Sequence, residues 1–141
     1  MDDYVRALPS LIMTGARRVI DAAVAHAERI GIPVCAAVTD RAGNLLAYVR
    51  MDGAPLFSEQ LAWDKAYSVA AFNGRPTHEW WDAIADDPPV RNGLGCADRL
   101  VIFGGGVPIR VSGELVGAIG VSGGSAEQDR EIADAGVAAL T

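Results

Sequence analysis

The chain has 141 residues, of which 50% are hydrophobic and 21% are charged, with a formal net charge of −6. This length is enough for one domain to close a hydrophobic core, so we expect a single domain over residues 1–141. The net negative charge and the scattered basic residues provide no footprint for a phosphate backbone, which excludes nucleic acid as an expected partner. The high apolar content predicts a buried interface in a homo-oligomer.

Localisation and thiol chemistry follow from what the sequence lacks. No apolar run reaches the roughly 18 residues of a membrane helix. The chain begins Met1-Asp2-Asp3, without the basic start and apolar core of a secretory signal, so we expect a cytoplasmic protein without a membrane partner. Cys35 and Cys96 have neither metal-knuckle spacing nor the density of a disulfide scaffold, and we expect free thiols.

The first half of the chain predicts one helix and one hairpin. Apolar residues repeat at helical spacing from Ser10 to Ile30, with Ser10 as a possible cap and Gly31 as a stop. Two apolar runs over 34–39 and 45–50 are separated by a five-residue turn, which is typical of a β-hairpin.

The second half predicts helices first and then strands. We expect a helix from Ser58 to Phe72, a short helix from Thr77 to Ala85 with Thr77 as its cap, and a loop over 90–99. Ser125 and Gln128 match a capping box for a last helix that reaches about Leu140. Three strands are predicted between these helices, over 100–103, 108–111 and 115–121.

The order of these elements defines the expected fold class. One helix, two strands, two helices, three strands and a final helix do not form a regular βαβ alternation. The sequence therefore predicts an α+β domain in which helices pack on an antiparallel sheet.

Several motifs occur together in a fixed order. They are Arg50-Met51-Asp52-Gly53-Ala54-Pro55, Asp64-Lys65-Ala66-Tyr67, the glycine-dense stretches 104–108 and 117–124, and Glu127-Gln128-Asp129. In this combination the chain resembles the GlcG/HbpS-type haem-binding family, also called haem-degrading proteins, from about Leu11 to Leu140. The resemblance implies a five-stranded antiparallel sheet with helices on both faces, in a profilin-like or GlcG-like arrangement. It also implies haem as a possible cofactor, and relatives linked to glycolate use or fused to corrinoid adenosyltransferases.

The glycine-rich passage from strand to helix is a candidate anion site. Ser122, Gly123 and Gly124 precede the last helix, whose free N–H groups could bind a carboxylate. The passage lacks the spacing of phosphate-binding loops and of dinucleotide-binding motifs. Alternatively, these glycines only turn the chain while Glu127 and Asp129 complement the helix dipole.

Gly105 and Gly106 join two strands, and we expect them to line a ligand pocket or to form a bulge. The loop with Arg50, Met51 and Asp52 would face them across that pocket.

Charged residues on the second helix are candidates for acid–base chemistry. Asp64 and Lys65 are adjacent among mostly apolar neighbours, and a partly buried lysine can act as a base or nucleophile. Tyr67 is a further candidate ligand-binding residue. The alternative for Asp64 and Lys65 is that they tie the helix to the sheet through ion pairs or hydrogen bonds.

The sequence contains two histidines, His26 and His78, which are candidate axial ligands if haem is bound. The alternative for each histidine, and the favoured one, is a solvated surface residue. Many members of the resembled family have a histidine in the first hairpin turn, where this chain has Asn44. Met51, Tyr67 and Cys96 remain further possible iron ligands, and Trp80 or Trp81 could stack on a planar ligand or pack in the core.

Three hypotheses follow. The leading one is an oligomeric protein that binds a small planar or carboxylate-bearing ligand, haem by resemblance, between the loop at 50–55 and the glycine-rich segments. The second is a metal-free isomerase, lyase or hydrolase of a small organic acid or ring compound, with Asp64 or Lys65 as acid or base. The third is a structural subunit whose glycine-rich corners serve assembly.

Overall fold

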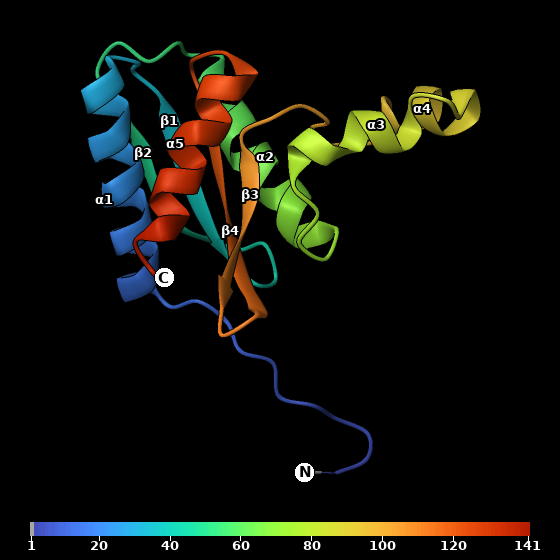
Figure 1. Cartoon of the computed structure of the whole chain (residues 1–141). Coiled ribbons are helices and arrows are strands. Elements are labelled where there is room, and N and C mark those ends of the chain that lie inside the picture. Colours follow the sequence, from blue (N-terminus) through green and yellow to red (C-terminus); the bar gives the residue numbers. More distant parts are fainter. Residues whose placement is uncertain (1) are drawn as a thin grey trace.

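The computed structural model describes residues 2–141, which form an α+β fold (Figure 1). The helices are α1 (Met13–Ile30), α2 (Ser58–Ala71), α3 (Trp80–Ile84), α4 (Pro88–Leu94) and α5 (Ala126–Ala138), with a short 3-10 helix η1 (Thr77–Glu79) before α3. The strands are β1 (Cys35–Asp40), β2 (Leu45–Arg50), β3 (Gly106–Val111) and β4 (Glu114–Ser122).

Within residues 2–141 the sheet has four strands, in the order β2-β1-β4-β3, and every neighbouring pair is antiparallel. The expectation of five strands was wrong, because the segment 100–103 does not join the sheet. The backbone N–H of Val101 donates instead to Ser68 Oγ at 2.9 Å, and that hydroxyl also lies 2.9 Å from the Arg99 carbonyl oxygen. This segment is therefore held against α2 rather than against another strand.

Helices cover both faces of the sheet, as expected. α1 and α5 pack side by side on one face, and α2 packs on the other against β1, β3 and β4. The alternation along β1 explains the two layers, since Ala36 and Val38 join the core under α1 and α5, while Cys35 and Ala37 face α2.

Glycines set the close approach of α2 to the sheet. A Cβ at Gly120 would overlap the Ala62 carbonyl oxygen, and a Cβ at Gly106 would lie 2.6 Å from the Lys65 carbonyl oxygen. Both positions therefore exclude a side chain, and much of the glycine-rich signal in the sequence is explained by helix packing.

Two of the predicted helix ends agree with the structure. Gly31 ends α1 in the left-handed conformation, and Ser125 with Gln128 forms the expected capping box of α5. Thr77 does not cap a helix with its side chain, because its hydroxyl accepts the N–H of Gly106 at 2.9 Å.

Two boundary predictions were wrong. α1 begins at Met13 and not at Ser10, whose hydroxyl accepts the Arg41 N–H at 3.1 Å. Residues 88–94 form α4 where a loop was expected, because Asp87 caps the Val90 N–H at 3.3 Å and proline occupies the first turn.

Two parts of the chain extend from the body of the fold (Figure 1). The segment before α1 runs away from the sheet, and α3 with α4 extends outward beyond α2. Among the helices of residues 2–141, none has both the length and the apolar character needed to cross a lipid bilayer.

Candidate functional site

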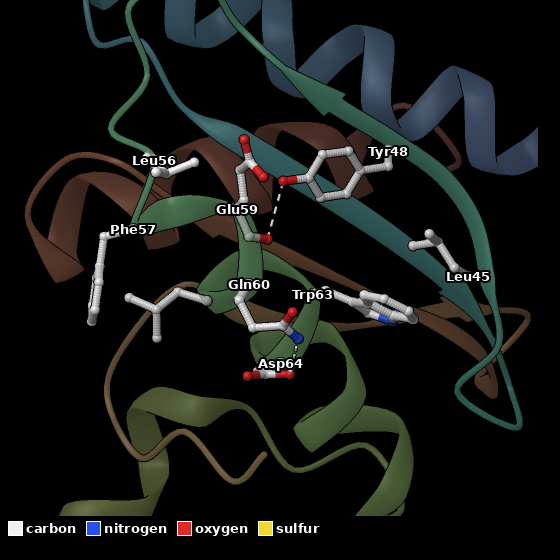
Figure 2. Close-up of a pocket in the computed structure, with 9 residues that line it drawn as sticks. Leu45, Tyr48, Leu56, Phe57, Glu59, Gln60, Trp63 and Asp64 are labelled. Carbon is white, nitrogen blue, oxygen red and sulfur yellow. Dashed lines mark hydrogen bonds between the residues drawn. The ribbon is translucent and has the colours of Figure 1, made fainter.

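An open apolar groove lies between β2 and the beginning of α2, with a volume of about 690 Å³ (Figure 2). β2 is an edge strand, so the space beside it is not filled by another strand. The lining residues come from β2, from the turn before α2 and from α2 itself: Leu45, Tyr48, Leu56, Phe57, Glu59, Gln60, Leu61, Trp63 and Asp64.

Large apolar side chains stand exposed along this groove. Leu56 is 77% and Phe57 80% exposed, and the flanking Leu45 and Tyr48 are about two-fifths exposed. Concentrated exposure of this kind is typical of a surface that contacts a ligand or another protein.

One edge of the groove carries a polar contact network. The Tyr48 hydroxyl donates to the Glu59 carbonyl oxygen at 3.0 Å, and Arg50 Nε lies 3.6 Å from Glu59 Oε1. Burial raises the pKa of the Tyr48 phenol. Burial also raises the pKa of the neighbouring Cys35 thiol, which is enclosed in the core under α2.

The other end of the groove contains a cluster around Asp64. Asp64 Oδ1 accepts from Gln60 Nε2 at 2.9 Å and from Arg99 Nε at 2.8 Å. The Arg99 guanidinium lies 3.9 Å from the ring centre of Tyr67 and 4.8 Å from that of Trp63. Asp64 and Tyr67 were both expected from the sequence, and both contact Arg99, which the sequence did not indicate.

Lys65 lies away from the groove. Its side chain is 1% exposed, and Nζ donates to the Val121 carbonyl oxygen at 2.9 Å and to Asp129 Oδ2 at 3.0 Å. Burial lowers the pKa of Lys65 and raises that of Asp129, and in each case the charge of the partner opposes the shift. This closed ion pair joins α2 to α5 across the end of the sheet.

The glycines expected to face a ligand surround this ion pair. The Gly124 N–H donates to Asp129 Oδ1 at 2.8 Å, so a protein carboxylate already occupies the amide that a ligand would need. Gly105 has a φ of +129°, and a Cβ there would lie 2.7 Å from Lys65 Nζ. Ser122 is buried at the end of β4, and Gly123, with a φ of +150°, packs against Pro33 and Val34.

The remaining predicted site residues are dispersed. Met51 packs against the core under α1 and α5, with Sδ 3.5 Å from the Val34 backbone nitrogen, while Asp52 is exposed in the following turn. His26 Nε2 lies 3.6 Å from Glu131 Oε1 between α1 and α5. His78 lies on η1, where burial lowers its pKa. None of these four side chains lines the groove.

Most of the residues that line the groove were not predicted from the sequence. Leu56 and Phe57 follow Pro55 directly, and two consecutive large apolar residues in a turn were a usable signal for an exposed apolar site. The role of Asp129 as the partner of Lys65 was not accessible, because 64 positions separate the two residues and no local pattern links them.

Comparison with known proteins identifies the family. The family model described as haem degrading protein HbpS-like matches residues 11–138. The chain belongs to this family.

Within residues 2–141, no group of three or more His, Cys, Asp or Glu side chains is arranged so that it could hold a metal ion.

Curated relatives show similarity over most of the chain. An uncharacterized 15.0 kDa protein in the dhaT-dhaS intergenic region of Citrobacter freundii is 37% identical over 128 residues, which cover 90% of this chain and 89% of that protein. The protein GlcG of Escherichia coli K12 is 34% identical over 107 residues, covering 76% and 77%. The predicted GlcG/HbpS relationship is confirmed.

Solved structures agree with the fold of the whole chain. The Klebsiella pneumoniae protein ORFY superposes with a TM-score of 0.91 at 31% identity, covering 99% of this chain and 97% of that one. A structure described as a PduOC:heme complex superposes with a TM-score of 0.82 at 33% identity, covering 94% and 96%. The same fold thus occurs in a protein solved together with haem.

Proposed function

We propose that this protein binds haem, or a similar flat ligand that carries carboxylates, in the groove between β2 and α2. The observation that carries the proposal is the groove itself, which exposes Leu56 and Phe57 in an open apolar surface. Pockets for cofactors are typically concave and mostly apolar, with few polar groups. The related protein solved as a haem complex supports haem as the ligand to test first.

The groove residues fit a porphyrin ring better than they fit iron. Phe57, Leu56 and Trp63 offer apolar and aromatic contacts for a flat ring, and Arg50 beside Glu59 could pair with a propionate. The nine lining residues include no histidine, cysteine or methionine, and the Tyr48 hydroxyl is engaged by Glu59. Haem, when bound, would supply the redox chemistry of its iron, while the chain would hold the ring and orient its carboxylates.

His26 and His78 remain proposed iron ligands for a different binding mode. His26 lies between α1 and α5, and His78 lies on η1. Coordination by either residue would place haem outside the groove. The two modes predict opposite effects of histidine substitution.

The experiment compares haemin with metal-free protoporphyrin IX by absorbance titration. We expect both ligands to bind with similar affinity, because the apolar contacts do not involve iron. Phe57→Ser should weaken both about tenfold to a hundredfold, as expected for losing the burial of one aromatic side chain. Trp81→Ser is the matched control, because Trp81 is an aromatic residue that is 51% exposed and does not line the groove. It should leave both affinities unchanged.

A histidine-dependent result would contradict the groove. If protoporphyrin IX failed to bind, and haemin binding were lost in His26→Ala or His78→Ala but kept in Phe57→Ser, iron ligation outside the groove would replace this proposal. If every variant bound both ligands as tightly as the wild type does, uptake would be nonspecific.

A metal-free enzyme is a second candidate, favoured by the position of Asp64. Both hydrogen bonds to this carboxylate within residues 2–141 converge on Oδ1, which leaves Oδ2 for a proton transfer at the groove. Lys65 is less suited to that role, since its amine is closed in the ion pair with Asp129. Turnover of a small ring-containing acid that is lost in Asp64→Asn and kept in Lys65→Met would support this function.

We also propose that the chain forms a homo-oligomer. Tyr4 is 96% and Val5 62% exposed on the segment before α1, and neither lines the groove, so further apolar surface is left uncovered within one chain. Light scattering after size exclusion should give a mass above the 14.7 kDa of one chain, and a monomer at micromolar concentration would contradict self-association.

A further inference from the structure

Three departures from ordinary protein structure occur together beside the groove, two at Arg99 and one at Trp63. The φ of Arg99 is +64°, in the left-handed region that a residue with a side chain adopts only at some cost. The Nη2 of Arg99 is buried and has no hydrogen-bond partner among residues 2–141. The indole Nε1 of Trp63, which the guanidinium overlies, is likewise buried without a partner.

Buried donors without acceptors are rare, because each forfeits its hydrogen bond to water. Here two of them belong to residues in direct contact, and one is part of a cation. Backbone strain combined with unsatisfied polar groups is typical of functional sites, where surrounding structure offsets the cost.

The surrounding contacts fix the orientation of the guanidinium. Asp64 Oδ1 accepts Arg99 Nε at 2.8 Å, and the ring of Tyr67 lies 3.9 Å from the guanidinium carbon. The Arg99 side chain keeps 29% of its surface exposed and Asp64 keeps 15%, so the cluster stays open to a ligand at its edge. Trp63 and Asp64 both line the groove, which makes the cluster a second polar end of the groove, in addition to the network around Glu59.

We propose that Arg99 and Trp63 recognise a carboxylate of the flat ligand in the groove, with Asp64 and Tyr67 positioning the guanidinium. This inference rests on the proposed function, because the ligand must lie in the groove to present its carboxylate there. An arginine N–H and an indole N–H are both donors, and the positive charge strengthens the bond to an anionic oxygen. The negative charge of Asp64 is balanced by the guanidinium of Arg99, while Gln60 adds an uncharged hydrogen bond, so the Asp64–Arg99 pair has no net charge before the ligand arrives.

The test compares protoporphyrin IX with its dimethyl ester, which keeps the ring and removes both carboxylates. Wild-type protein should bind the acid about tenfold more tightly than the ester. Arg99→Met should weaken binding of the acid up to about tenfold and leave binding of the ester unchanged, and Trp63→Phe should weaken binding of the acid a few-fold. If Arg99→Met proves unstable, Arg99→Lys replaces it in the test. This variant keeps the charge and should retain part of the preference for the acid.

Arg75→Met is the matched control, since Arg75 also lies over a tryptophan, at 5.1 Å from the Trp80 ring centre, and does not line the groove. It should leave both affinities unchanged. An acid preference undiminished in Arg99→Met would overturn the carboxylate site while the groove proposal stood.

Benzoate separates failure of the carboxylate site from failure of porphyrin binding. If no porphyrin bound, benzoate would still be expected to shift the NMR signal of the Trp63 indole N–H, identified by its loss in Trp63→Phe. A shift that disappears in Arg99→Met would support the carboxylate site without haem. No shift, together with no acid preference, would overturn it.

Discussion

Asp64 and Lys65 are neighbours on α2, yet the structure gives them opposite surroundings. Asp64 faces the groove, where its carboxylate meets Gln60 and Arg99 at a partly open surface. Lys65 points to the end of the sheet, where its ammonium is enclosed and bound to Asp129. Adjacent residues on a helix point about 100° apart, which is enough to place one in a candidate site and the other in a structural tie.

The two regions also differ in how they use glycine and aromatic residues. Around Lys65 the chain is compressed, and Gly105 is needed because a side chain there would strike both the Val121 carbonyl oxygen and the lysine amine. Around the groove the chain is open, and Leu56 and Phe57 project without intramolecular cover. Glycine density in this molecule therefore marks tight packing, while exposed apolar residues mark the candidate ligand site.

Breaking the closed region should produce the largest effect. Lys65→Met leaves the Asp129 carboxylate buried without its counter-ion, and we expect the free energy of unfolding to fall by about 3–5 kcal/mol. The double variant with Asp129→Leu should recover part of the loss, because an apolar pair replaces the uncompensated charge. Urea unfolding at pH 7 measures both changes.

The same variant also tests the division of roles. If Lys65→Met stayed folded and lost porphyrin binding, Lys65 would belong to the ligand site and the contrast with Asp64 would be wrong. A loss below about 1 kcal/mol would instead show that the pair contributes little to stability.

The second prediction concerns the contact between α2 and the sheet. Gly120→Ala places a methyl group against the Ala62 carbonyl oxygen, and we expect a loss of about 1–3 kcal/mol or more, because α2 must move. Gly93→Ala on α4 is the matched control, since a Cβ there meets nothing within 4 Å. Gly93→Ala should raise the free energy of unfolding by up to about 1 kcal/mol, because alanine has a higher helix propensity than glycine. Equal effects of both variants in thermal unfolding would contradict the packing role of Gly120.

The fold was largely predictable because its signals are local. The periodicity of α1, the hairpin of β1 and β2, and the capping box of α5 each depend on residues within one element. The predicted fifth strand does not form for a non-local reason, because the Val101 N–H donates to Ser68, 33 positions away. Strand propensity alone cannot detect such competition.

The candidate site was only partly predictable for the same reason. Asp64 and Tyr67 were recognised as possible site residues, but Arg99, which contacts both, belonged to a segment assigned as loop. The pairing of Asp129 with Lys65 exists only once α2 and α5 are folded onto opposite faces of the sheet. Physical contact across layers leaves no spacing rule in the sequence.

A smaller effect is expected at the open end of the comparison. Asp64→Asn keeps the shape and one acceptor oxygen but removes the charge that faces Arg99, across a pair that is partly exposed. We expect a loss of about 1 kcal/mol or less in urea unfolding, well below that of Lys65→Met. A loss as large as that of Lys65→Met would mean that the two neighbours share one structural role.

The smallest predicted effect is a pH dependence at His78, outside both regions. Burial, and next the charge of Arg130, lower the pKa of His78 below its unfolded value of about 6.5. The unfolded chain therefore binds the proton more readily, and stability falls as pH drops from about 6.5 toward the lower folded pKa. His78→Asn should flatten this decline relative to wild type in urea unfolding at pH 7.5, 6.5 and 5.5. His26→Asn, on α1 beside Glu131, is the matched control, and an identical flattening in both variants would show that the surroundings of His78 are not its cause.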